Sequence, residues 1–351
     1  MKNTSYTRRR VLRGAAWLPV ALVPGSNYAQ STSASNEAEP AHAAHAALSA
    51  WITAQRGRSI GYLLRNISPK ISFVRTVDSV NIAPDRLEVA HREAVRPGSG
   101  IRFEGNKFVQ EVTALPGSVL AADRGKPEEP DYAFHWVRDS SLIMHEMATL
   151  LSRRKPLQPA GLDQRWEEYV SFSKTLQRTP STVGSGEVRY NLDGTQDYLQ
   201  WSRPQHDGPP LRALALLHFS PAHGEPESAR SLRHAVLERD LDDVAASWNT
   251  PGFDLWEEYN AQDFHARVVR LGALQSGAIW ARQRGDIERA KHYQAIVEAL
   301  RGALEQHWLP DQSYYGFHLG PTLYWDGKEK TKPGGNQIGR ASCRERVLTD
   351  V

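Results

Sequence analysis

The chain has 351 residues, of which 40% are hydrophobic and 24% charged, a composition typical of soluble globular proteins. The formal charge of +3 comes from basic residues near the two ends, and the remainder is slightly acidic, which argues against nucleic-acid binding and fits a neutral substrate. The only cysteine, Cys343, lies in the last ten residues, so no disulfide is expected.

The N-terminus has the pattern of an export signal. Residues 7–13 read Thr-Arg-Arg-Arg-Val-Leu-Arg, a twin-arginine sequence, and a short apolar run follows. That run is far shorter than the ~20 residues that a membrane span needs. Residues 1–29 are therefore predicted to be a twin-arginine signal peptide that directs the protein to the periplasm or outside the cell. Residues 30–45 are predicted to form a flexible linker because they are rich in Ser, Ala, Glu and Pro.

The rest of the chain is predicted to be mostly helical. Residues 68–130 are rich in Val, Pro and Gly and favour loops with short strands. About seven helices are expected in all, joined by long irregular connections. Gly285 separates the last two, which predicts an antiparallel hairpin, and small residues in the first of this pair would let another backbone approach closely. The clearest helices are predicted at 46–66, 140–153, 163–179, 210–219, 262–284 and 286–308.

Residues 130–139 read Pro-Asp-Tyr-Ala-Phe-His-Trp-Val-Arg-Asp, which places aromatic rings beside an Arg/Asp pair. Flat apolar rings stack on the C–H faces of a sugar, and charged groups make strong hydrogen bonds to its hydroxyls. A purely structural alternative is a buried ion pair at a helix start, with Asp139 as the N-cap.

A second segment, residues 201–209, reads Trp-Ser-Arg-Pro-Gln-His-Asp-Gly-Pro and forms a loop before an apolar helix. Loops frequently carry functional residues. Asp207 could instead simply cap the following helix, and Trp201 could be either a stacking platform for a sugar or a core residue.

A third segment, residues 251–260, reads Pro-Gly-Phe-Asp-Leu-Trp-Glu-Glu-Tyr-Asn and combines a turn with carboxylates and a tryptophan. Apolar surroundings and neighbouring carboxylates raise a carboxyl pKa, as a general acid requires. Asp254 and Glu257 would share a face if this segment were helical. Residues 166–169 repeat Trp-Glu-Glu-Tyr within a predicted half-exposed helix, so the tetrapeptide alone is weak evidence.

Together, and in this order, the three segments resemble glycoside hydrolase family 15, the glucoamylases (glucan 1,4-alpha-glucosidases), over roughly residues 48–336. The resemblance implies an all-α (α/α)6 barrel of six helical hairpins, with the active site at one end. Residues 46–337 would form part of such a catalytic domain. It further implies an enzyme that needs no metal or other cofactor. The expected partner is an α-glucan or maltooligosaccharide substrate, with no nucleic acid, no stable membrane insertion, and a monomeric state.

The resemblance also implies roles for individual residues. Glu257 would be the general acid, and Asp254 would support it. Arg138 and Asp139 would clamp the terminal glucose. The remaining expected substrate-binding residues are Tyr132, Trp136 and Trp201 in the walls of the site, and Leu255, Trp256 and Glu258 beside the next sugar. Phe134 and His135 depart from the fungal pattern, which has Tyr and Thr there.

The C-terminal tail, residues 338–351, looks non-native. Residues 338–347 read as a translated sequencing adapter (atc gga aga gcg tcg tgt agg gaa aga gtg), whereas the last four residues do not fit this origin. The family's catalytic base, and a further sugar-binding arginine, would then lie in downstream sequence that this chain lacks. The full-length protein is expected to be an inverting exo-glycosidase that releases β-D-glucose, and the fragment to be inactive and poorly folded.

Three other functions stay open at this stage. A family 15 relative acting on trehalose, dextran-type glucans or short α-glucosides would use the same acid and clamp. A non-catalytic glucan-binding protein would keep these residues but lack the base. A helical-hairpin protein without sugar chemistry is the third.

Overall fold

The structure is a computed structural model that describes residues 38–122, 131–153, 161–221 and 224–324. The predicted signal peptide and the tail after residue 337 lie outside these ranges. The chain divides into two compact units between Arg56 and Gly57. Helix α2 (Ala38–Asn66) crosses this division. It begins eight residues before the predicted start, so the end of the predicted linker is helical, and it ends where the sequence predicts.

The first unit contains the N-terminal part of α2, whose described side chains are exposed, including Trp51 at 59%. None of the helices in the described ranges is long and apolar enough to cross a membrane.

The second unit begins with a small antiparallel sheet in the order β1-β3-β2. This confirms the short strands expected between residues 68 and 130, although the sequence analysis did not predict helix α3 within that region. Phe108 of β3 is fully buried and packs with Ile82 and Tyr198 in a local core. The elements here are β1 (Ser72–Asp78), η1 (Ser79–Asn81), η2 (Pro84–Arg86), α3 (Leu87–Ala94), β2 (Ile101–Glu104) and β3 (Lys107–Thr113).

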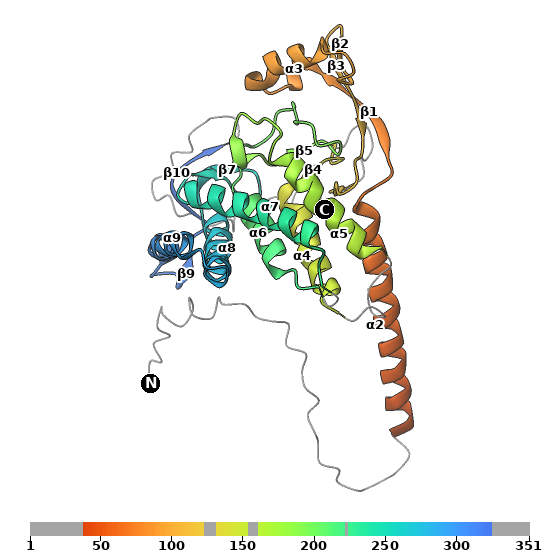
Figure 1. The fold of residues 1–351 in the computed structure, drawn as a ribbon, viewed down its shortest axis with the longest axis vertical. Coiled ribbons are helices and arrows are strands. Elements are labelled where there is room, and N and C mark those ends of the chain that lie inside the picture. The colour runs from red at the N-terminus through yellow and green to blue at the C-terminus, as the bar shows by residue number, and fades with distance from the viewer. Residues whose placement is uncertain (1–37, 123–130, 154–160, 222–223, 325–351) are drawn as a thin grey trace. The chain divides into compact units, whose positions relative to one another are not determined.

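Three helical hairpins then follow in chain order (Figure 1). Within them, α4 packs on α6 and α6 on α8, whereas α5 packs on α7, so the hairpins stand side by side in two layers. This confirms the prediction of a mostly helical chain arranged as hairpins. The helices are α4 (Val137–Leu151), α5 (Leu162–Leu176), α6 (Gly208–His218), α7 (Glu227–Ala246), α8 (Phe264–Gln283) and α9 (Ile287–Glu305).

The main hydrophobic core lies between these helices and includes Met144, Leu216 and Leu241. The antiparallel pair α8 and α9 is confirmed, and Gly285 in their connection has a φ of +82°, which favours glycine. At Gly277, where the sequence predicts the approach of another backbone, it is the Leu241 side chain that lies close, 2.8 Å from the position of a Cβ atom.

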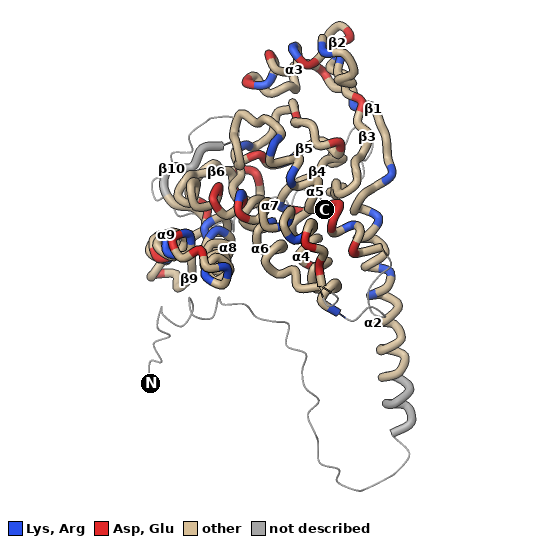
Figure 2. Tube along the Cα trace, in the orientation of Figure 1, with Lys and Arg blue, Asp and Glu red and all other residues tan. Residues whose placement is uncertain are grey.

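The apolar pattern does not mark the ends of α7, because the buried face of this helix carries Arg233 and Asp240 among its apolar residues. Basic and acidic residues are mixed along α9, whereas the C-terminal part of α7 gathers Asp240, Asp242 and Asp243 (Figure 2).

Short strands in the connections between the helices carry parts of the first and third motif segments, whereas the second, residues 201–209, is a loop that leads into α6. β4 pairs with β5, β7 lies between β10 and β6, and β8 pairs with β9, all antiparallel. These strands are β4 (His135–Trp136), β5 (Arg189–Tyr190), β6 (Gly252–Phe253), β7 (Tyr259–Asp263), β8 (Trp308–Leu309), β9 (Tyr314–Tyr315) and β10 (His318–Tyr324), and a short 3-10 turn, η4 (Gly184–Gly186), precedes β5.

Candidate active site

The third motif segment forms a tight hairpin turn between β6 and β7. A helix was one possibility for this segment from its sequence. Instead, the Asp254 backbone N–H donates to the Tyr259 carbonyl at 3.0 Å and closes a turn. Asp254 and Glu257 therefore do not share a helix face. Glu257 adopts a φ of +62°, the left-handed conformation that costs a non-glycine residue about 1–3 kcal/mol. We call residues 254–259 the acid turn.

The Glu257 carboxylate gathers donors from the first two motif segments. Its Oε1 accepts from Gln205 Nε2 at 2.9 Å, and from Trp136 Nε1 and Arg138 Nη2, both at 3.4 Å. The Ser202 hydroxyl donates to the Glu257 carbonyl at 2.7 Å. Three segments far apart in the sequence thus converge on one carboxylate, whose side chain is 20% exposed.

Arg138 is the link between these groups. Its Nη1 donates to Gln205 Oε1 at 2.6 Å and to Asp207 Oδ2 at 3.0 Å. Asp139 lies 3.8 Å from the Arg138 guanidinium and is 47% exposed, in the first turn of α4. The N-cap is Trp136, so the alternative reading of Asp139 as a cap is wrong.

Asp207 stands at the N-cap of α6, but its side chain makes no capping bond there. It binds Arg138 instead and lies 3.5 Å from His265 Nε2. Burial alone would raise the pKa of Asp207, but the neighbouring imidazole of His265 and the charge of Arg138 lower it. Burial likewise opposes protonation of His265, yet Asp207 raises its pKa. Asp207 is therefore held as an anion that fixes Arg138.

Aromatic rings form a wall beside this cluster. Trp136 lies 5.7 Å, centroid to centroid, from both Tyr132 and Trp201. Tyr132 is 40% exposed. The guanidinium of Arg189 lies 3.8 Å from the Trp201 ring centroid and 4.1 Å from that of Phe134. Trp201 is thus a half-buried residue stacked on a buried cation.

Arg189 belongs to a network of buried charges behind the wall. It faces Trp136 across the β4–β5 pair, and its Nε donates to Asp197 at 2.7 Å. Arg203 also binds Asp197 and donates to Glu187 at 2.6 Å. Burial would raise the pKa of Asp197, but the two arginines lower it to about 2. We call the rings of Phe134, Trp136 and Trp201, together with the Arg189–Asp197 pair that supports them, the aromatic wall.

The remaining predicted residues are in the acid turn but outside the cluster around Oε1. Trp256 is 65% exposed, and Leu255 and Glu258 are half-buried. Asp254 is only 2% exposed and points its carboxylate back into the turn and toward His318.

Several residues of this site were not predicted. Gln205 lies within a segment that the sequence did single out, so its amide could have been found there. Arg189 and His318 gave no signal, because only strand pairing brings them to the motif segments.

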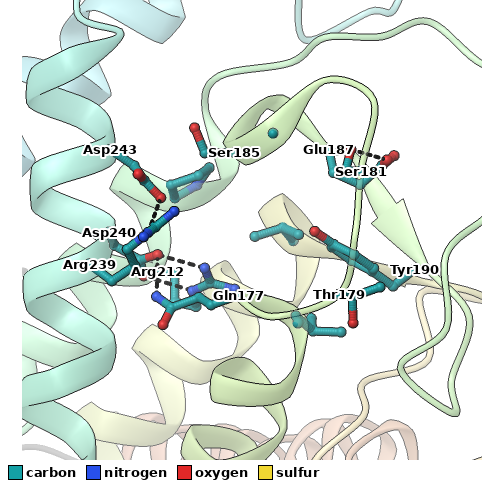
Figure 3. Close-up of a pocket in the computed structure, with 14 residues that line it drawn as sticks. Gln177, Thr179, Ser181, Ser185, Glu187, Tyr190, Arg212, Arg239, Asp240 and Asp243 are labelled. Carbon is teal, nitrogen blue, oxygen red and sulfur yellow. Dashed lines mark hydrogen bonds and ion pairs between the residues drawn. The ribbon is translucent and has the colours of Figure 1, made fainter.

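A polar cavity of about 170 Å³ lies beside the site, and Val137 and Pro209, close in sequence to Arg138 and Asp207, line it. Figure 3 shows its charged groups paired with charged or polar side chains. Asp240 binds Arg212 and Gln177, Asp243 binds Arg239, and Glu187 accepts from Ser181. Within the described ranges, no three His, Cys, Asp or Glu side chains are grouped so that they could hold a metal ion.

Comparison with known proteins shows the family and the fold. The model of "Glycosyl hydrolases family 15" matches residues 106–328. A glucoamylase of Blastobotrys adeninivorans is 33% identical over 60% of this chain and 36% of its own length. Glucoamylase 1 of Rhizopus oryzae is 28% identical over 76% of this chain and 38% of its own length. The chain therefore spans less than half the length of these relatives.

Two solved structures share the fold. A glucoamylase from Saccharomycopsis fibuligera has a TM-score of 0.54 at 26% identity, covering 58% of this chain and 46% of the other. The family 15 glucoamylase from Hypocrea jecorina has a TM-score of 0.53 at 28% identity, covering 66% and 38%. These matches confirm the predicted fold class, so that the three hairpins are part of an (α/α)6 barrel. The chain belongs to glycosyl hydrolase family 15.

Proposed function

We propose that the whole protein is an inverting exo-glycosidase that releases β-D-glucose from the non-reducing ends of α-1,4-glucans, with Glu257 as its general acid. The observation that carries this proposal is the convergence of Trp136, Arg138 and Gln205 on the Glu257 carboxylate beside a wall of aromatic rings. The names of the related glucoamylases support the substrate class.

The hydrogen bonds suggest how Glu257 transfers its proton. All three donors converge on Oε1, so this oxygen accepts hydrogen bonds and carries no proton. The proton of the acid form then resides on Oε2, which delivers it to the glycosidic oxygen as the bond to the glucose carbon breaks. After transfer, the same donors stabilise the carboxylate that remains.

Asp254 does not suit the role of base. Its carboxylate is buried and bonded to the protein through both oxygens, so it is not placed to activate a water. An inverting enzyme needs its second carboxylate about 6.5–9.5 Å from the acid, on the opposite face of the sugar. We propose that this base lies downstream of residue 337 in the full-length protein.

The clamp and the wall would bind the sugars. Arg138 and Asp139 would hold the hydroxyls of the terminal glucose, and the 47% exposure of Asp139 leaves its carboxylate accessible for this. Tyr132, Trp136 and Trp201 would supply the stacking surface. Leu255, Trp256 and Glu258 would contact the sugar next to the scissile bond.

We also propose that the protein acts outside the cytoplasm, exported through the twin-arginine pattern of residues 1–29, as a monomer and without a cofactor. A fusion of residues 1–45 to a reporter tests the export. Replacing Arg8 and Arg9 with Lys should keep the reporter in the cytoplasm.

The decisive experiment uses the full-length gene product. Glu257→Gln should lower kcat about 1000-fold, because general acid catalysis contributes about 10²–10⁴. The repeated tetrapeptide provides a matched control, since Glu167 is an exposed helical residue in the same local sequence. Glu167→Gln should leave activity unchanged. NMR of the first product should show the β anomer, and near-normal activity of Glu257→Gln would remove it as the acid.

Substrate range needs a separate test. The full-length protein should release glucose from starch and maltose faster than from trehalose or isomaltose. The reverse order would identify a relative with different linkage specificity, and binding of glucans without hydrolysis would identify a non-catalytic protein.

A further inference from the structure

The acid turn depends on one buried carboxylate. Oδ1 of Asp254 accepts the backbone N–H groups of Glu258 at 2.8 Å and Tyr259 at 3.3 Å. The Asp254 carbonyl accepts the Glu257 N–H at 2.9 Å. Asp254 therefore sets the path of the backbone on both sides of Glu257.

The backbone of the acid turn is strained at Glu257, the proposed general acid. Glu257 has a φ of +62°, and a non-glycine residue keeps such a conformation only when its surroundings fix it. If the bonds to Asp254 were lost, the backbone could relax toward negative φ. The Glu257 carboxylate would then leave Trp136, Arg138 and Gln205.

Asp254 is in turn held by a residue from a distant strand. Nε2 of His318 lies 3.1 Å from Asp254 Oδ2, and both side chains are at least 90% buried. His318 belongs to β10, which pairs with β7 so that His318 lies opposite Asp263. The imidazole packs 5.2 Å from the Tyr259 ring, which fixes its direction. A buried carboxylate oxygen without a donor is costly, so the orientation of Asp254 depends on His318.

We propose that His318 is a positioning residue for the general acid: it fixes Asp254, which fixes the strained turn that aims Glu257. His318 donates a hydrogen bond and transfers no proton to substrate. This inference rests on the proposed role of Glu257, but its structural part can be measured without any activity.

The chain offers matched variants. In His318→Leu the donor is lost. In His318→Gln the amide nitrogen stands near the position of Nε2 and can still donate. The control is His307→Leu, because His307 is also fully buried in the same part of the chain, yet its ring lies 3.0 Å from Arg267 and from the Gly316 carbonyl rather than contacting the acid turn.

The first measurement is backbone hydrogen exchange in the folded protein. Protection of the Glu258 and Tyr259 amides should fall at least about tenfold in His318→Leu and recover in His318→Gln. In His307→Leu these two amides should exchange as in the wild type, even if the protein is less stable overall. Unchanged protection in His318→Leu, or equal loss in both leucine variants, would overturn the proposal.

The second measurement is kinetics of the full-length protein. His318→Leu should lower kcat about 100-fold, since a displacement near 1 Å can have that effect, while KM changes less than about threefold. His318→Gln should recover to within about tenfold of wild type. A change in KM alone would contradict a role in aiming the acid. Full activity of Glu257→Gln would refute the proposed function instead, and the exchange results would still stand.

Discussion

The aromatic wall and the acid turn meet at Glu257 but are built in different ways. In the wall, Trp136 and Trp201 pack against the buried guanidinium of Arg189, which is 2% exposed and paired with Asp197. In the acid turn, no arginine is needed to shape the backbone. One carboxylate, Asp254, accepts two backbone N–H groups and holds a residue at positive φ.

The aromatic wall contributes to the stability of the fold, whereas the acid turn determines the orientation of Glu257. A buried cation between rings, held by charged neighbours, costs several kcal/mol to disrupt, so the wall is tied to the stability of the whole fold. The acid turn stores strain and owes its shape to a few hydrogen bonds, so it should fail locally. Damage to the wall should therefore appear first as lost stability, and damage to the turn first as lost activity.

The largest effect is expected when the wall loses its cation. Arg189→Met leaves Asp197 with one arginine fewer and should lower the free energy of unfolding by about 3–5 kcal/mol, the usual result of breaking a buried pair. Urea denaturation measures this. The control is Arg239→Met, because Arg239 is 61% exposed in its pair with Asp243 and should contribute less than about 1 kcal/mol. Equal losses in both variants would contradict the distinction.

The next largest effect is on the pH dependence of the free energy of unfolding, to which Asp197 of the aromatic wall and His206 near the acid turn contribute in different pH ranges. The folded pKa of Asp197 is about 2, below its unfolded value near 3.9, so its contribution exists above pH 4 and is lost as pH falls toward 2. Burial and Arg270 lower the pKa of His206, beside the acid turn, to about 4. Between pH 6.5 and 4, His206 is protonated in the unfolded chain but neutral in the folded protein. The free energy of unfolding therefore decreases as the pH is lowered through this range.

Each contribution should amount to about 2–4 kcal/mol. Urea denaturation from pH 7.5 to 2 should show a first decline above pH 4, to which buried His135 and His307 also contribute, and a second below it. Asp197→Asn should remove part of the second decline only, and His206→Gln part of the first. Identical pH profiles for the two variants would contradict this assignment.

The sequence predicts those features whose residues lie close together in the chain or repeat with a regular period. Long amphipathic helices such as α9 were visible because their apolar residues repeat by threes and fours, whereas α7 was not bounded because Arg233 and Asp240 face its core. Glu257, Trp136 and Arg138 were found because they sit in compact motifs. Arg189 and His318 were not, since they reach the site only through pairing of β5 with β4 and of β10 with β7. The roles of the motif residues remain predictions.

A smaller effect should follow from crowding β6. A Cβ atom on Gly252 would lie 2.8 Å from His206 Cδ2 and 3.1 Å from the Pro204 carbonyl oxygen, so Gly252→Ala should push the acid turn away from the loop that carries Gln205. We expect kcat of the full-length protein to fall about tenfold, equivalent to about 1.4 kcal/mol. Gly302→Ala on α9 is the control, because nothing lies within 4 Å of its Cβ position. It should leave kcat unchanged and slightly raise stability.

The smallest effect isolates the strain in the acid turn itself. Glu257→Ala and Glu257→Gly both remove the carboxylate and its bonds to Trp136, Arg138 and Gln205, so both should be inactive. In the folded state they differ in how readily the backbone accepts a φ of +62°. Glycine adopts that conformation without the Cβ clash, so Glu257→Gly should be more stable than Glu257→Ala by about 1 kcal/mol in urea denaturation. Glycine also gains more freedom in the unfolded chain, which works against this difference. A glycine variant less stable than the alanine variant would mean that the turn holds no strain at Glu257, and that its shape follows from Asp254 alone.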